Sequence, residues 1–176
     1  MKLKDLLIDA LLEIGDLKGV EPYPMRNISP YGADFKLDND VHVHIVTNPI
    51  IEKSKLKFDF GEVENYLQDI YNVGFDVGGS QTQFKKTNYL TLLRIIRSVV
   101  EVIQYQIKKY ASINYKGDPL PIYVFFAGGK SDLEAESPQK KKLYQQVILK
   151  NLGSDWETGT VNYNGKTGFY IREKEK

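Results

Sequence analysis

The sequence predicts an α+β fold with a mixed, mostly antiparallel sheet packed by helices. Apolar residues recur at helical spacing from Asn88 to Tyr110, and charged residues occupy the opposite face. Ile122–Phe126 is a continuous apolar run, which is typical of a central strand buried on both faces. Asn164-Gly165 separates two short strand-like segments, a pattern that favours a β-hairpin. A long helix, a central strand and a C-terminal hairpin therefore define the expected architecture.

Length and composition limit the class of protein. The 176 residues fit one domain, and 41% hydrophobic with 27% charged residues is an ordinary globular balance. The absence of cysteine excludes disulfides, zinc–thiolate sites and thiol nucleophiles. A net charge of +1 lacks the basic excess of most nucleic-acid binders, so nucleic acid is not an expected partner.

The sequence has no signature of a membrane span or a secretion signal. No apolar run approaches about 18 residues, and Asp5, Asp9 and Glu13 interrupt the apolar N-terminal segment. We therefore expect a cytoplasmic protein without membrane association.

The N-terminal 34 residues are expected to stand apart from the main domain. Apolar residues at helical spacing predict an amphipathic helix over 1–17. Prolines and glycines predict an irregular connector over 18–34, which leaves a single α+β domain over 35–176. The helix is then available to dock on a protein partner or on a second copy of the chain.

Three strands are expected before the long helix. The alternation of apolar and polar residues predicts strands at Val41–Val46, Leu56–Phe60 and Tyr71–Val77. The first two are expected to pair as an antiparallel hairpin with a long loop, and 62–69 to form a helical turn or loop. After the central strand, Ser137-Pro138 predicts the start of a further helix.

Two histidines are the candidate metal ligands. His42 and His44 are two positions apart on a predicted strand, so their side chains share one face. A third ligand would come from Asp40 or Asp59. The alternative is a polar strand face exposed to water, and because no further His or Cys completes a site, we expect no metal.

Glycines and lysines before the long helix are the candidate anion ligands. Gly78 and Gly79 end a strand, and Lys85 and Lys86 precede the helix, an arrangement that can hold an anion at a helix N-terminus. The alternative is a loop that caps the strand. A Gly-Gly-Lys-Ser segment at 128–131 lacks the first glycine of a phosphate-binding loop, so we expect no nucleotide there and no cofactor.

Clustered cations form a further, weaker candidate surface. Lys140–Lys142 and the pair Arg94 and Arg97 lie on two predicted helices. A solvated helix face is the ordinary interpretation of such residues. Together with Lys85 and Lys86, the lysine cluster supports a third hypothesis, a nucleic-acid-associated protein.

From Tyr71 to Arg172, the predicted order of strand, long helix, strand, helix and strands resembles the GNAT-type N-acetyltransferase family. In that family the loop before the long helix holds the coenzyme A pyrophosphate through a Gln/Arg-x-x-Gly-x-Gly/Ala motif, which is absent from the matching segment 78–87. The family often places a tyrosine general acid in the helix after the next strand, where Tyr144 stands. The resemblance implies a coenzyme A-dependent acyltransferase.

The same region is also similar to short proteins of tailed bacteriophages. The similarity rests on the helix Asn88–Tyr110, the segment Phe125-Phe126-Ala127 and the Lys-Lys-Leu-Tyr turn at 141–144. It implies a non-catalytic accessory or virion-associated protein that acts by protein–protein interaction or self-association. We take this as the first functional expectation and the acyltransferase as its alternative.

Overall fold

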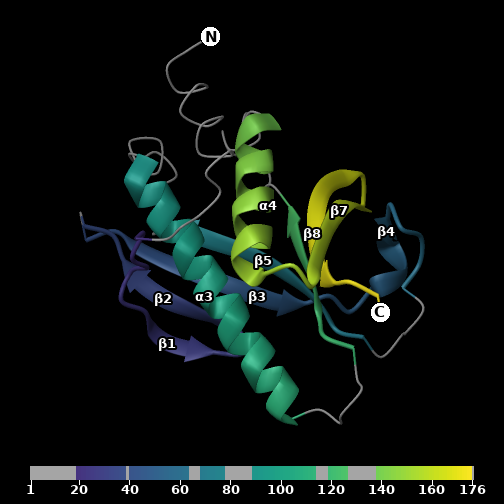
Figure 1. Cartoon of the computed structure of the whole chain (residues 1–176), viewed down its shortest axis with the longest axis horizontal. Helices are drawn as coiled ribbons and strands as arrows, with labels where there is room; N and C mark the ends of the chain where they lie inside the picture. Colours follow the sequence, from purple (N-terminus) through teal and green to yellow (C-terminus); the bar gives the residue numbers. More distant parts are fainter. Residues whose placement is uncertain are drawn as a thin grey trace.

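The computed structural model describes residues 19–38, 40–63, 68–77, 89–113, 119–126 and 138–175. These residues form an eight-stranded mixed sheet and two α-helices that lie on one face of it (Figure 1). The strands follow the spatial order β1-β2-β3-β5-β6-β8-β7-β4. Their bounds are β1 Arg26–Ser29, β2 Gly32–Lys36, β3 His42–Pro49, β4 Leu56–Phe58, β5 Ile70–Val77, β6 Ile122–Phe126, β7 Trp156–Tyr163 and β8 Lys166–Glu173.

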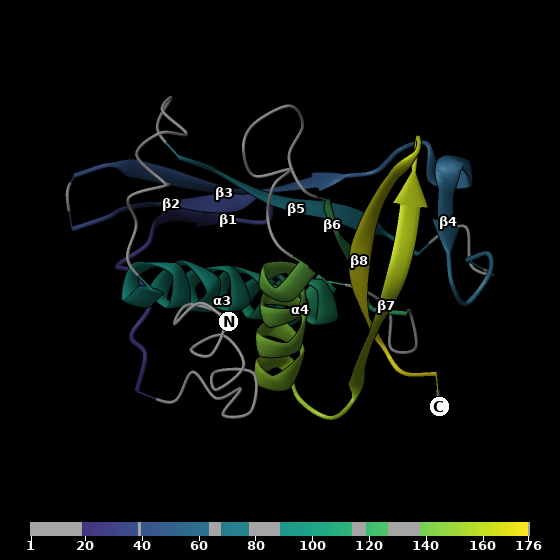
Figure 2. The same cartoon turned by 90° about the horizontal axis from the view of Figure 1, so that it is seen from above.

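The α+β class and the mixed, mostly antiparallel sheet are confirmed, because one strand pair, β5 with β6, is parallel and the other described pairs are antiparallel. The helices are α3, Tyr89–Ile113, and α4, Pro138–Leu152. Figure 2 shows both helices on the same side of β1, β2, β3 and β5, while β7 and β8 turn steeply out of the plane of those strands. None of the described helices is long and apolar enough to cross a membrane.

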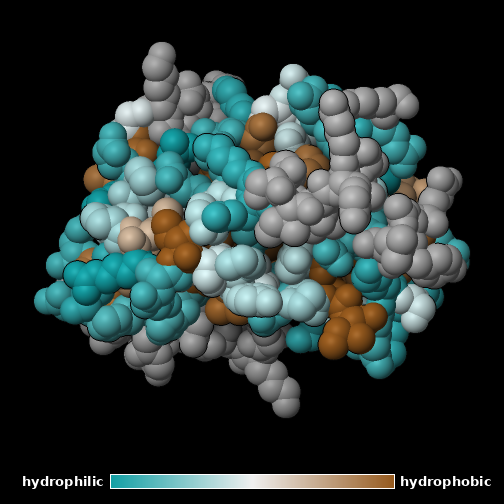
Figure 3. All heavy atoms as spheres, turned by 90° about the horizontal axis from the view of Figure 1, so that it is seen from below, coloured by the Kyte–Doolittle hydropathy of each residue, from teal (hydrophilic) through white to brown (hydrophobic). Residues whose placement is uncertain are grey.

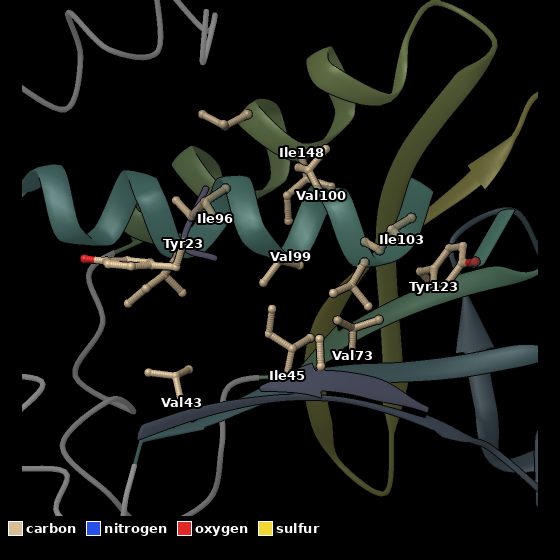
Figure 4. Close-up of a cluster of buried hydrophobic side chains, with 14 of the residues drawn as sticks. Tyr23, Val43, Ile45, Val73, Ile96, Val99, Val100, Ile103, Tyr123 and Ile148 are labelled. Atoms are coloured by element: carbon tan, nitrogen blue, oxygen red, sulfur yellow. The ribbon is translucent and has the colours of Figure 1, made fainter. Parts of the chain in front are cut away.

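The main core lies between α3 and the strands beneath it. Ile95, Ile96, Val99, Val100, Val102 and Ile103 of α3 are buried at helical spacing. Val43 and Ile45 of β3 and Val73 of β5 point toward this helix (Figure 4). Each such side chain contributes about 1.5–3 kcal/mol of transfer free energy when buried. The predicted long helix is thus confirmed, and its apolar face packs on strands β3 and β5.

A second core lies on the opposite face, around the central strand. Ile122 and Val124 pack there with Leu56, Phe58, Ile70, Val161 and Tyr170, whereas Tyr123 between them packs in the main core. Strand β6 is therefore buried on both faces, as its continuous apolar sequence predicts.

The predicted pairing of the strands at 41–46 and 56–60 is wrong. β3 pairs with β2 and β5, whereas β4 pairs with β7 at the far edge of the sheet. Phe58 explains the destination of β4, because its ring stacks on Phe60 and meets Tyr170 edge to face. The alternation of apolar and polar residues along a strand indicates which side chains share a face. It does not indicate which strand lies beside it.

The irregular connector predicted over 18–34 is wrong from residue 26 onward, because β1, a short turn and the first part of β2 lie there. Ala33, Phe35 and Leu37 are buried at every second position and pack in the main core. Tyr23 precedes them, is buried as well, and stacks on Phe35 with ring centroids 5.1 Å apart. The prolines in this segment led to the prediction of a connector. Pro30, however, lies in the turn between β1 and β2, where proline is compatible with a hairpin.

The second helix and the C-terminal hairpin are confirmed. α4 begins at Pro138 and ends before Gly153, whose φ of +110° favours glycine. Asn164 and Gly165 both have positive φ and join β7 to β8. The expected N-terminal helix over 1–17 lies outside the described residues.

Candidate functional site

The parallel strands β5 and β6 are paired at their N-terminal ends and diverge after Asn72 and Val124. We call this arrangement the fork, and its two arms are the parts of β5 and β6 beyond these residues. They are paired at three register positions, from Ile70 opposite Ile122 to Asn72 opposite Val124. Beyond Asn72 no residue of β5 has a partner in β6 within the described part of the chain, although β5 continues to Val77. Figure 1 shows the two strands pointing in different directions at their C-terminal ends.

Each arm of the fork is held by its other neighbour. β5 stays paired with β3 up to Val77, the partner of Val43. On the other arm, Phe125 of β6 is paired with Phe169 of β8, and their rings stack 4.6 Å apart. The two arms are therefore each held by a different strand, and their divergence does not depend on contact between them.

Among the described residues, the fork leaves backbone hydrogen-bonding groups of β5 without a partner in β6 beyond Asn72. In an antiparallel ladder every second residue exchanges hydrogen bonds with a given neighbour, and the residues between point the other way. Alternate residues of 73–77 therefore direct N–H and C=O groups toward the side on which β6 has diverged. This edge can accept an extended ligand that carries amide groups.

Tyr144 is the one predicted catalytic residue that the structure describes. It lies on α4, the helix that follows β6, and is half-buried against the main core. Its hydroxyl oxygen is buried. The predicted anion ligands Gly78, Gly79, Lys85 and Lys86 lie outside the described residues, in the segment between β5 and α3.

The histidines lie on β3 with exposed side chains, on the face away from the helices, as the alternation predicts. Asp34 of β2 is the register partner of His44, and its Oδ1 is 2.5 Å from His44 Nδ1. Asn27 of β1 donates a hydrogen bond from Nδ2 to Asp34 Oδ2 at 3.1 Å. These hydrogen bonds, that of Asn27 first, hold the pKa of Asp34 below its usual value.

Neither carboxylate that the sequence offered as a third metal ligand binds a histidine in the structure. Asp59 lies near β4, where Tyr170 and the backbone N–H of Thr160 donate hydrogen bonds to it. Asp40 is exposed and lies 4.0 Å from Lys36 Nζ. Asp34 was missed because the sequence pattern predicts a connector where its strand lies. Within the described ranges, no group of three or more His, Asp or Glu side chains is arranged to hold a metal ion.

The arginines of the proposed basic surface have acidic partners. Arg94 is paired with Asp38 at 3.2 Å, and its guanidinium lies over the ring of Tyr23. Arg97 is paired with Glu101 at 3.3 Å. These pairs neutralise part of the charge on which the nucleic-acid hypothesis depends.

A second polar cluster, which sequence reasoning missed, ties the edge strand β4 to the C-terminal hairpin. The Tyr170 hydroxyl donates to Asp59, and Arg172 Nε donates to Glu157 Oε1 at 2.6 Å. The Arg172 guanidinium also lies 3.7 Å from the centre of the Phe60 ring. Burial first, and the hydrogen bond to Asp59 next, raise the pKa of Tyr170 above its usual range. Because its partners are internal, this cluster stabilises the fold.

Comparison with known proteins finds no matching family model, no matching curated protein and no matching solved structure.

Proposed function

We propose that the chain binds a coenzyme A-type acyl donor in the fork between β5 and β6 and transfers its acyl group to an amine. The observation that carries the proposal is the fork itself, where two parallel strands pair over three positions and then diverge. The order β5, α3, β6, α4 and the hairpin β7–β8 supports the likeness to GNAT-type acetyltransferases. A fold alone does not decide function, so the proposal rests on the chemistry of the fork.

The pantetheine arm of coenzyme A suits a strand edge. It is an extended chain with two amide groups, and it can pair with alternate N–H and C=O groups of 73–77 as an added strand does. The thioester at its end would then lie between the two arms. The sequence between β5 and α3 contains Gly78, Gly79, Lys85 and Lys86, residue types that suit the pyrophosphate.

In the proposed reaction, a neutral amine attacks the thioester carbon and forms a carbon–nitrogen bond, while the carbon–sulfur bond breaks. The nitrogen loses one proton to water, and the leaving thiolate takes a proton from an acid. Tyr144 is the candidate donor of that proton, because it lies on the helix that follows β6. A tyrosine hydroxyl is among the groups that serve as general acids in enzymes.

Thermal unfolding with added ligands tests the proposal. A ligand at about 100 times its Kd stabilises the folded state by about 2.7 kcal/mol. We expect coenzyme A and pantetheine each to raise the melting temperature, because the fork binds the pantetheine arm. A rise with 3′-phospho-ADP alone would place binding elsewhere, and no rise with coenzyme A at millimolar concentration would reject the proposal.

A second proposal keeps the first expectation from the sequence, a protein-binding role such as that of a phage accessory or virion-associated protein. Strand β1 lies at the edge of the sheet, and Ile28 in this strand and Tyr31 in the turn after it are exposed. An edge strand presents unpaired backbone groups to another chain. Figure 3 shows one face of the molecule, where hydrophobic surface is broken into small separate patches, so a modest interface fits better than a large one.

Oligomeric state and partner capture test this second proposal. We expect Tyr31→Lys to weaken self-association measured by light scattering, or capture of a partner protein, because it places a charge at the turn of the edge hairpin. Lys166→Glu, at the distant β7–β8 hairpin, is the matched control. A monomer that captures no partner would count against a protein-binding role.

A further inference from the structure

We propose that His42 and His44 together bind one divalent transition-metal ion of the zinc, nickel or copper class, with Asp34 orienting the ring of His44. The sequence alone argued against a metal, because no further His or Cys completes a site. The structure supplies the group that positions one of them. This inference does not depend on the acyl-donor proposal, because it concerns the exposed face of β1, β2 and β3.

The two imidazoles share one surface hollow. Positions two apart on a strand are separated by about 6.7 Å along the chain and face the same way. Both side chains line a hollow of about 340 Å³, together with Asn27 and Asp34. Imidazole nitrogens bind zinc at about 2.0–2.1 Å, so two rings that line one hollow can bind the same ion.

The contact with Asp34 decides which nitrogen of His44 is available. A carboxylate accepts hydrogen bonds, so the 2.5 Å contact places a proton on His44 Nδ1 and leaves the lone pair of the neutral ring on Nε2. Metal-binding histidines usually have this arrangement, with the second nitrogen bound to a carboxylate that fixes the ring. Asn27 holds Asp34 in turn, so the orienting carboxylate is itself restrained.

The surrounding charges bear on the affinity. Arg26 and Lys36 also line the hollow and oppose a cation, although Lys36 lies within 4.0 Å of the Asp40 carboxylate. Imidazole ligands favour zinc, copper and nickel, whereas magnesium and calcium require oxygen ligands. We therefore expect selectivity for the first group, with water completing the coordination.

The composition makes the test direct. The chain contains two histidines and no cysteine, so untagged protein has no other imidazole or thiol ligand. Calorimetric titration with zinc chloride and with nickel chloride at pH 7.5 should give one ion per chain. Proton NMR should show both imidazole signals shifting together, or broadening together with nickel. Magnesium chloride should give neither response.

Three variants separate direct binding from positioning. His42→Gln and His44→Gln should each reduce affinity at least tenfold, and both side chains are exposed, so folding is preserved. Asp34→Asn should weaken binding by about 10–100-fold, because it removes the carboxylate that orients the ring. Asp155→Asn, at an exposed position that does not line the hollow, is the matched control and should keep the affinity of the parent protein. Equal binding by the double variant H42Q/H44Q, or no zinc or nickel binding by the parent at millimolar concentration, would overturn the proposal.

Discussion

The Tyr170 hydroxyl on β8 donates a hydrogen bond to Asp59 Oδ1 at 2.9 Å, although 111 residues separate the two in the chain. Asp59 follows β4, whose only strand partner in the described sheet is β7. The contact therefore joins an edge strand to the C-terminal hairpin. It also closes the second core, where Phe58 and Phe60 pack against the ring of Tyr170.

Loss of the Asp59 carboxylate should destabilise the protein. Asp59→Ala leaves the largely buried Tyr170 hydroxyl without its acceptor and removes the hydrogen bond from the Thr160 N–H. We expect a loss of about 1–3 kcal/mol in the free energy of unfolding, measured by urea denaturation. Glu62→Gln, a nearby exposed position, should change it by less than about 0.5 kcal/mol. Equal stability of the two variants would show that the contact contributes little.

The raised pKa of Tyr170 should make part of the stability depend on alkaline pH. Because the folded-state pKa lies above the unfolded value of about 10, the contribution is fully present below pH 10 and is lost as pH rises toward the folded value. The difference in unfolding free energy between the parent and Tyr170→Phe should therefore shrink from pH 8 to pH 11. A difference that stays constant over this range would contradict a shifted Tyr170.

Gly168 should be required where β8 meets β6. A Cβ at this position would come within 2.2 Å of the Phe125 carbonyl oxygen, so Gly168→Ala should strain the arm of the fork and destabilise the fold. Gly74 of β5 is the matched strand glycine, because a Cβ added there would have no atom within 4 Å. Gly74→Ala should be neutral or stabilising by up to about 1 kcal/mol. Thermal unfolding compares the two variants, and similar melting temperatures would refute the steric argument.

Truncation in the main core should show how strongly α3 holds the sheet. Ile103 is fully buried, and Ile103→Ala should reduce the unfolding free energy by about 2–5 kcal/mol, whereas Ile103→Val should cost about 0.5–1.5 kcal/mol. Ile51 is 90% exposed, so Ile51→Ala is the control and should stay within about 0.5 kcal/mol of the parent. A mild effect of Ile103→Ala would mean that the core tolerates the cavity by collapsing around it.

Tyr144→Phe tests the general acid of the proposed acyl transfer. Removing the hydroxyl should lower kcat for thiol release from acetyl-coenzyme A by about 10²–10⁴-fold, because the thiolate loses its proton donor. The melting-temperature rise caused by coenzyme A should persist, because the variant keeps the ring that packs against the core. An unchanged kcat would exclude Tyr144 as the acid, without bearing on donor binding.

The elements that sequence reasoning found are those with strong local patterns. The helix α3 shows its helical spacing over 25 residues, and β6 shows an unbroken apolar run. The elements it missed, β1 and β2, are short and interrupted by Pro30. As a consequence the sequence pointed to Asp40 and Asp59 as partners of the histidines, and the tertiary structure places Asp34 there.

Composition and periodicity, read from the sequence by itself, determined the fold class, the long helix, the doubly buried central strand and the shared face of His42 and His44. These properties depend on residues close together in the chain, whose spacing sets the direction of each side chain. Only the tertiary structure decided that β4 pairs with β7, that β5 and β6 diverge after Asn72, and that Asp34 contacts His44. Several strands have apolar faces with a similar alternation, so the sequence pattern allows more than one pairing. The packing of the whole core determines which strands pair.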